Sequence, residues 1–259
     1  MLDTAKSLKG YRLQATDGPL GEVQEFYFDD KHWAVRYLVL DTGDWLSSRK
    51  VLISPYALTN VDHQGRSISA CLTKKQVEES PSPDTAKPVS KQFEENYNAY
   101  YGWPAYWNGL SMWGAYSYVM LPRPGEHPVV GGRHDAWDPH LRSTRHVAGF
   151  SVVANDGEIG HVDDFVIDDG SWAIRYLVVA THNWWPGKKV LISPQWIKSV
   201  NWDHMGSLKI DLKREAIRSS PAYSEQALLT RDHESALHRH YERPGYWAEE
   251  KSAASMPRP

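Results

Sequence analysis

Cysteine is almost absent from this sequence, and its scarcity excludes two kinds of site. The 259 residues include one cysteine, Cys71. An internal disulfide framework and a zinc site made of several thiolates are therefore excluded. Because a single cysteine suits oxidising and reducing compartments equally, cysteine usage does not place the protein in a compartment.

The sequence also lacks a strong excess of either charge. It has 29 lysines and arginines against 32 aspartates and glutamates, which gives a formal net charge of -3. A chain with this balance carries no strong overall field that would attract nucleic acid or acidic lipid. We therefore expect no nucleic-acid partner.

A signal peptide and a clear transmembrane helix are missing as well. The first residues, MLDTAKSLKGYRL, have no apolar core of the signal-peptide kind, so we expect a cytoplasmic protein. Residues 97–122 carry no charge over a length that could cross a bilayer. Proline, glycine and asparagine interrupt this segment, and its tyrosines and tryptophans prefer the membrane interface. The sequence predicts no transmembrane span and leaves peripheral association with the inner membrane open.

The sequence does contain an internal repeat. Residues 8–62 align with residues 147–201 without a gap, at roughly two dozen identical positions. The segment AVRYLVL at 34–40 returns as AIRYLVV at 173–179, and each copy has an arginine within an apolar run. The chain therefore contains the same unit twice.

A second pair of segments extends the repeat. YGWPAYW at 101–107 returns as YERPGYW at 241–247, in register with the sequence before it after a shift of one residue. We call these two segments the aromatic clasps. Tyrosine and tryptophan combine large apolar area with a polar tip, so we expect each clasp to cover a barrel, either its own or the other one.

The repeated unit has the pattern of short β-strands. Asp-Gly turns separate runs rich in β-branched and aromatic residues, which indicates hairpins. Ser54-Pro55 and Ser193-Pro194 resemble helix N-caps followed by proline, and Thr73 with Gln76 forms a capping-box pattern that the second copy lacks. We predict a mainly β fold with short helices: two antiparallel β-barrels in tandem, each followed by a helix and an aromatic clasp.

The repeat also suggests domain boundaries. We place the first barrel with its helix and clasp at residues 1–107 and the second at residues 147–247. Residues 108–146 are the connecting segment, and residues 248–259 form a tail. The proline, glycine and histidine content of the connection is typical of a loop.

The repeated motifs resemble those of the PRC-barrel family. The resemblance lies in G-x-x-[VL], the Asp-Gly turn, G-x-[VI]-x-[DE]-F, the Trp-Ala-[VI]-Arg-Tyr-Leu-Val strand and Lys-Val-Leu-Ile-Ser-Pro. DPHLRSTRHVAGF at 138–150 and NWWPGKKVLISPQW at 183–196 are similar to tandem PRC-barrel proteins of bacteria. The domain is shared by the H subunit of the photosynthetic reaction centre and by ribosome maturation factors. The resemblance implies a barrel that binds other macromolecules, without catalytic residues common to the family.

Arg36 and Arg175 are the charged residues of the repeated strand. Both faces of this strand are largely apolar, and an unpaired buried guanidinium would be costly. We expect an arginine-carboxylate pair in each barrel, because the guanidinium fork suits a carboxylate; an anion site or a partner site is the alternative. The candidate acids belong to the preceding strand in each copy and are Asp29, Asp30, Asp168 and Asp169.

The other polar clusters do not form a recognisable catalytic or metal site. The aspartates near His161 lack the alternate spacing of a calcium loop. His233, Glu234 and His238 read H-E-x-x-x-H, and a spacing of five turns the two imidazoles roughly 140° apart on a helix, whereas zinc-binding H-E-x-x-H places them on one face. Phosphate-loop and nucleophile-elbow patterns are absent. We therefore expect no catalytic residue, metal or cofactor, and no enzyme.

Three functions are compatible with these features. The first is a non-catalytic protein-binding adaptor, either monomeric or a homo-oligomer. The second is a peripheral accessory of a photosynthetic or respiratory membrane complex that influences electron or proton transfer, and the third is a metal-dependent hydrolase. Tryptophan is enriched in binding hot spots, so Trp45, Trp184 and Trp185 are candidate partner contacts, unless they cover their own barrels.

Overall fold

The chain folds into two compact units. The computed structural model describes residues 1–46, 50–82, 89, 91–107, 111–113, 119, 140–181, 187–203 and 205–248. The first unit comprises Met1, residues 3–146 and residues 167–174, and the second comprises Leu2, residues 147–166 and residues 175–259. Each unit contains most of one sheet, and the first unit also includes a few residues of the second sheet, among them Asp3 and Thr4 of β1 (Leu2–Thr4).

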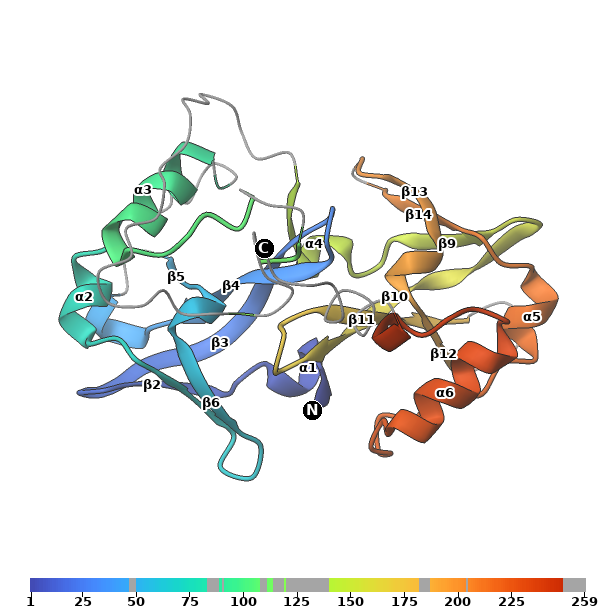
Figure 1. Cartoon of the computed structure of the whole chain (residues 1–259), viewed down its shortest axis with the longest axis horizontal. Coiled ribbons are helices and arrows are strands. Elements are labelled where there is room, and N and C mark those ends of the chain that lie inside the picture. The colour runs from blue at the N-terminus through green and yellow to red at the C-terminus, as the bar shows by residue number, and fades with distance from the viewer. Residues whose placement is uncertain are drawn as a thin grey trace, which may run out of the picture. The chain divides into compact units, whose positions relative to one another are not determined.

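The sheet of the first unit has seven strands (Figure 1). Six of them follow the order β5-β4-β3-β2-β7-β6. Their bounds are β2 (Arg12–Ala15), β3 (Gly18–Asp29), β4 (Ala34–Asp41), β5 (Val51–Ile53), β6 (Leu58–Asp62) and β7 (Ser67–Ala70). The seventh strand, β8 (Leu141–Ser143), lies antiparallel to β3.

The second sheet repeats this order as β12-β11-β10-β9-β14-β13. The bounds are β9 (Ser151–Ala154), β10 (Gly157–Asp168), β11 (Ile174–Ala180), β12 (Lys189–Ile192), β13 (Ile197–Asn201) and β14 (Ser207–Ile210). Its seventh strand is β1 (Leu2–Thr4), which pairs with β10. The duplication seen in the sequence is therefore a duplication of sheet topology.

The sheets are mixed, which corrects the expectation of purely antiparallel sheets. The hairpins are antiparallel as predicted, but β2 pairs with β7 in parallel, and β9 pairs with β14 in parallel. Turn residues show where the chain reverses between neighbouring strands. They do not show that the last strand returns beside the first in the same direction.

Short helices connect the strands and cover the sheets. The α-helices are α1 (Ala5–Leu8), α2 (Lys74–Glu78), α3 (Lys91–Tyr101), α4 (Thr144–Val147), α5 (Arg214–Arg218) and α6 (Arg231–His240), and the 3₁₀-helices are η1 (Gly43–Leu46), η2 (Pro55–Ala57) and η3 (Pro194–Trp196). Among the described residues, none of these helices has the length and apolar character needed to cross a membrane.

The predicted caps are confirmed. Ser54 and Ser193 accept hydrogen bonds from backbone amides at the start of η2 and η3, each followed by proline. Thr73 forms a capping box with Gln76 at the start of α2, whereas Lys213 makes no side-chain cap for α5. Local sequence therefore determines these helix starts.

A glycine in each long strand allows a close approach of two strands. A Cβ added to Gly21 of β3 would lie 2.1 Å from the backbone oxygen of Asp41, and one added to Gly160 of β10 would lie 1.9 Å from that of Ala180. Both glycines also have φ values in the positive region, 146° and 152°. Only glycine fits these positions.

Candidate functional site

Arg36 lies in β4 of the first sheet and is 1% exposed. Its Nη2 donates a hydrogen bond to Asp29 Oδ2 at 3.0 Å. The guanidinium carbon also lies 3.8 Å from the ring centre of Tyr106 and 4.6 Å from that of Trp113. A desolvated cation gains more from aromatic faces than an exposed one. One carboxylate and two aromatic rings therefore hold this buried charge.

Asp29 is kept ionised by its donors. It accepts a hydrogen bond from the backbone amide of Lys31 at 2.7 Å and lies 3.0 Å from His32 Nδ1. Burial alone would raise the pKa of Asp29, but the hydrogen bond from His32 and the charge of Arg36 outweigh burial, so its pKa lies well below the ordinary carboxyl value. The first unit thus contains a charged, buried arginine-carboxylate pair.

The corresponding arginine of the second unit also contacts its clasp. Arg175 of β11 is buried, and its guanidinium carbon lies 3.9 Å from the ring centre of Tyr246. Tyr246 and Tyr106 occupy the same position in the two clasps. In each unit the clasp tyrosine therefore stacks on the arginine of the same unit, which answers the question that the sequence left open.

A buried glutamate joins three elements of the first unit. Glu94 of α3 is fully buried. Its Oε1 accepts hydrogen bonds from Tyr37 Oη of β4 at 2.8 Å and from Tyr106 Oη of the clasp at 2.9 Å. Burial, followed by the negative charge of Glu94, raises the pKa of Tyr37 well above its ordinary value, so this hydroxyl remains a donor.

The second unit repeats the arrangement with one addition. Oε1 of the buried Glu234 in α6 accepts from Tyr176 Oη and from Tyr246 Oη, each at 2.9 Å. The hydroxyl of Tyr176 also lies 3.0 Å from His238 Nε2. Asn98 takes the place of His238 in the first repeat. Burial lowers the pKa of His238, which favours the neutral imidazole.

The sequence pattern alone does not indicate a role for these glutamates. Glu234 stands out only as part of H-E-x-x-x-H, and Glu94 belongs to no recognisable motif. In the structure, His233 Nδ1 lies 3.2 Å from Thr230 Oγ1 at the start of α6, while His238 packs against Trp196 in the core. The repeat itself could have indicated their role, because Glu94 and Glu234 are separated by the same number of residues as the two clasps.

The remaining candidate acids have other partners. Asp30 Oδ2 accepts from Arg142 Nε at 2.7 Å, Asp168 Oδ2 accepts from Ser171 Oγ at 2.7 Å, and Asp169 Oδ2 lies 2.7 Å from His63 Nε2. The structure therefore brings Arg36 to Asp29, pairs Asp30 with Arg142, and places Asp169 beside His63.

Of the three candidate contact tryptophans, the structure describes Trp45. Trp45 is half-buried, its Nε1 donates to the backbone oxygen of Leu20 at 3.1 Å, and the Lys74 amine lies 4.7 Å above its ring. These contacts indicate that Trp45 covers its own unit. Trp184 and Trp185 lie outside the described residues.

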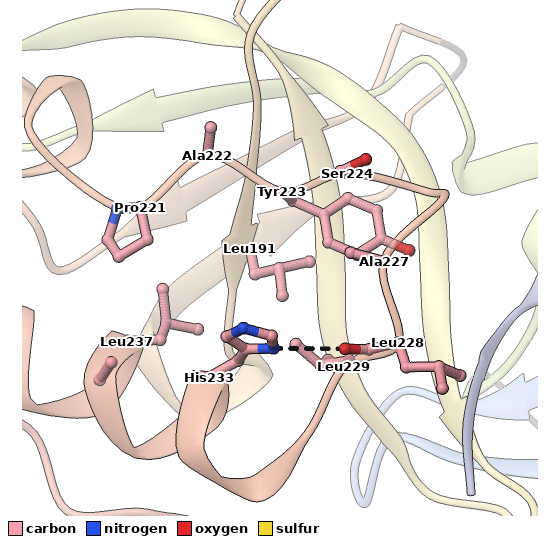
Figure 2. Close-up of a pocket in the computed structure, with 11 residues that line it drawn as sticks. Leu191, Pro221, Ala222, Tyr223, Ser224, Ala227, Leu228, Leu229, His233 and Leu237 are labelled. Atoms are coloured by element: carbon pink, nitrogen blue, oxygen red, sulfur yellow. Dashed lines mark hydrogen bonds between the residues drawn. The ribbon is translucent and has the colours of Figure 1, made fainter.

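An apolar pocket opens beside α6 in the second unit (Figure 2). Leu191 of β12 and Leu237 of α6 are its buried residues, and Leu228 lies at its side with 71% of its surface exposed. The other lining residues are Pro221, Ala222, Tyr223, Ser224, Ala227, Leu229, His233 and Ala236. Its volume is about 140 Å³, close to the roughly 150 Å³ apolar cavity that binds benzene in another protein. The pocket has room for one apolar side chain.

Comparison with known proteins shows which domain family the two sheet-forming segments match. A model of the PRC-barrel domain matches residues 3–74 and 142–205. Both matched segments contain the repeated arginine strand and end before the buried glutamate and the clasp. No curated protein matches the chain with significant similarity.

Proposed function

Because this chain belongs to the PRC-barrel domain family and contains two matching segments, we propose that it is a non-catalytic adaptor that binds partner proteins. The proposed contact is an apolar side chain of the partner, inserted into the pocket beside α6. The partner segment would also cover Leu228. This proposal takes the protein-binding alternative among the functions compatible with the sequence.

The exposed Leu228 beside an apolar pocket is the observation that carries the proposal. Four large apolar side chains among the described residues are strongly exposed: Met1, Tyr100, Met205 and Leu228. Of these, Leu228 lines the pocket. Burying a leucine side chain contributes roughly 1.5–3 kcal/mol, so this position offers binding energy that the isolated chain leaves unused.

The buried glutamates support a structural role over a catalytic one. A general acid or base must reach the proton that it transfers. Glu94 and Glu234 are buried, and in each the Oε1 atom accepts two tyrosine hydroxyls. Their contacts join strand, helix and clasp, which suits a rigid platform that presents a surface.

Affinity capture with surface variants tests the proposal. The full chain, its Leu228→Glu variant and its Ala236→Phe variant are each used to capture proteins from native cell extract, separated into soluble and membrane fractions. Ala236 is exposed and lines the pocket, so phenylalanine there is expected to fill the pocket. We expect a protein held by the unmodified chain to be lost, at least tenfold, with both variants.

Met205→Glu is the matched control, because Met205 is 92% exposed and does not line the pocket. This variant should retain the partner. Equal retention by all variants would contradict the pocket as the contact, and turnover of a small substrate without any retained protein would contradict the adaptor function. A membrane redox complex retained through Leu228 would identify the adaptor as a peripheral accessory of that complex.

A further inference from the structure

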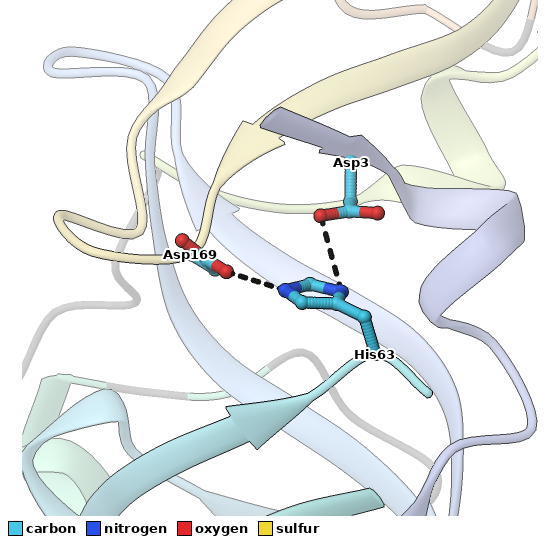
Figure 3. A group of neighbouring side chains, drawn as sticks. All are labelled: Asp3, His63 and Asp169. Atoms are coloured by element: carbon cyan, nitrogen blue, oxygen red, sulfur yellow. Dashed lines mark hydrogen bonds and ion pairs between the residues drawn. The ribbon is translucent and has the colours of Figure 1, made fainter. Parts of the chain in front are cut away.

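Three polar side chains from distant parts of the chain meet in the first unit (Figure 3). Asp3 lies in β1, His63 in the turn between β6 and β7, and Asp169 in the turn after β10. One potential ligand atom from each residue lies within 4.8 Å of the others. The set is a histidine with two carboxylates, which is a donor set suited to divalent transition metals.

Asp169 fixes the tautomer of His63. The distance from His63 Nε2 to Asp169 Oδ2 is 2.7 Å. An ionised carboxylate can only accept, so Nε2 must carry the hydrogen, and Nδ1 of the neutral imidazole is left with a free lone pair. Metal-binding histidines commonly have this arrangement, in which the second ring nitrogen donates to a carboxylate that orients the ring.

The lone pair of His63 points toward a second acceptor. Asp3 Oδ2 lies 3.4 Å from His63 Nδ1, and Figure 3 shows the two carboxylates at opposite edges of the ring. Both atoms are shielded from solvent, and neither has a hydrogen-bond partner. Two buried acceptors that face each other require a cation or a proton between them, since an unsatisfied buried polar group is costly.

The separation of these two atoms suits a metal ion better than a hydrogen bond. A hydrogen bond between nitrogen and oxygen is usually about 2.7–3.2 Å long. Two ligands of a tetrahedral zinc ion, each about 2.0–2.2 Å from the metal, lie roughly 3.3–3.5 Å apart. The observed 3.4 Å matches the second value.

Two carboxylates, those of Asp3 and Asp169, flank the imidazole of His63. The amino group of Met1 forms an ion pair with Asp169 Oδ1. A metal ion between Asp3 and His63 would offset the cost of burying the Asp3 carboxylate.

We propose that Asp3 Oδ2 and His63 Nδ1 bind a divalent metal ion of the zinc class, with Asp169 holding the imidazole in place. Water fills the remaining coordination positions, so the affinity is below that of a closed four-ligand zinc site. The ion links β1 to the turn after β6. Its role is to stabilise the first unit, and it is independent of the partner pocket.

Zinc titration of the untagged full chain tests this site. Calorimetry with zinc chloride alone should give a binding event with a stoichiometry near one, and zinc should raise the unfolding temperature because it binds the folded state. His63→Ala and Asp3→Asn remove a ligand and should abolish both effects. Asp169→Asn removes the orienting carboxylate and should weaken zinc binding by about 10–100-fold.

His146→Ala is the matched control, because His146 is an exposed histidine of the same unit. It should leave the zinc affinity and the temperature shift unchanged. Equal zinc binding by His63→Ala and the unmodified chain would overturn the proposal. A second result would also overturn it: zinc leaves the stability of the first unit unchanged, while acid raises that stability in the unmodified chain and not in His63→Ala. A proton would then occupy the position between the two acceptors.

Discussion

At the scale of single residues, Arg36 illustrates how a charge is accommodated in a strand that is buried along most of its length. Its planar guanidinium lies over the rings of Tyr106 and Trp113 and directs Nη2 toward Asp29. A lysine ammonium is a strongly hydrated point charge and would lose the stacking geometry. The residue therefore contributes packing as well as charge.

Replacing Arg36 should strongly destabilise the first unit. Arg36→Ala leaves the Asp29 carboxylate buried without its partner, and breaking a buried pair in this way costs about 3–5 kcal/mol. Urea unfolding should show this loss. Arg142→Ala is the control, because Arg142 is partly exposed and Asp30 keeps His140 Nδ1 at 2.8 Å, so the loss should be smaller. Equal losses in the two variants would contradict the special role of Arg36.

The sequence predicted the type of interaction at Arg36 but not all of its partners. An arginine in an apolar run requires a carboxylate, and the preceding strand offered several. The alternation of side chains along β4 does not show that Tyr106 would reach the guanidinium from the clasp. Asp3 and His63 had no signal at all, because Asp3 precedes the aligned repeat and tryptophan occupies the position equivalent to His63 in the second copy.

At the scale of elements, the clasps are integral parts of the units. Each clasp tyrosine both stacks on a strand arginine and donates to a helix glutamate. The helix is thereby tied to the sheet through the clasp. The segments outside the matched domain model are thus packed against the residues inside it.

Removing one clasp hydroxyl should weaken this connection measurably. Tyr106→Phe keeps the ring on Arg36 but removes one donor to the buried Glu94, and a hydrogen bond to a charged group contributes about 1.5–3 kcal/mol. The free energy of unfolding of the first unit should fall by that amount. Tyr100→Phe is the control, because its exposed hydroxyl donates to a neutral backbone oxygen, and its loss should be smaller. A Tyr106→Phe variant with unchanged stability would show that Tyr37 alone satisfies Glu94.

Elements with a local signal were predictable and the others were not. The capping box at Thr73 and the serine caps could be identified from a few adjacent residues. In contrast, β6 and β13 have mostly polar, exposed residues, LTNVD and IKSVN. These segments are strands because β7 and β14 offer them backbone hydrogen bonds. Such tertiary pairing leaves little trace in the residue pattern.

At the scale of the whole molecule, the repeat predicted two units. It did not predict that a segment of the second repeat would belong to the first unit. The first unit includes residues 167–174, which belong to the second repeat in sequence. Val35 donates its backbone hydrogen to Trp172 O at 2.8 Å, and Ile174 donates to Trp33 O at 2.7 Å. An alignment of the two copies shows that they are similar. It does not show that the end of a strand in one copy pairs with residues of the other copy.

The two units should differ in their response to mild acid. Burial lowers the folded-state pKa of His238 below its ordinary value of 6.5. The stability linked to this histidine is therefore fully present above pH 6.5 and is lost as the pH falls toward the lower folded-state pKa. The unfolding temperature of the second unit should fall between pH 7 and pH 5.5, as measured by calorimetry.

His238→Asn, which introduces the residue found at Asn98 of the first unit, provides the comparison. This variant should lose part of the pH dependence of the second unit and leave the first unit unchanged. Arg36→Ala identifies the transition of the first unit, because its effect is confined there. An identical pH dependence in the unmodified chain and in His238→Asn would show that other groups cause the acid sensitivity.

The placement of residues 141–143 and 167–174 in the first unit also has a consequence for biosynthesis. The ribosome must extend the chain from the first clasp to residue 174 before these segments can join the sheet. Synthesis proceeds at about 5–20 residues per second, so β3 lacks its neighbour β8 for roughly two to seven seconds after the first clasp has been made. Its unpaired strand edge is exposed to other nascent chains and to chaperones throughout that interval.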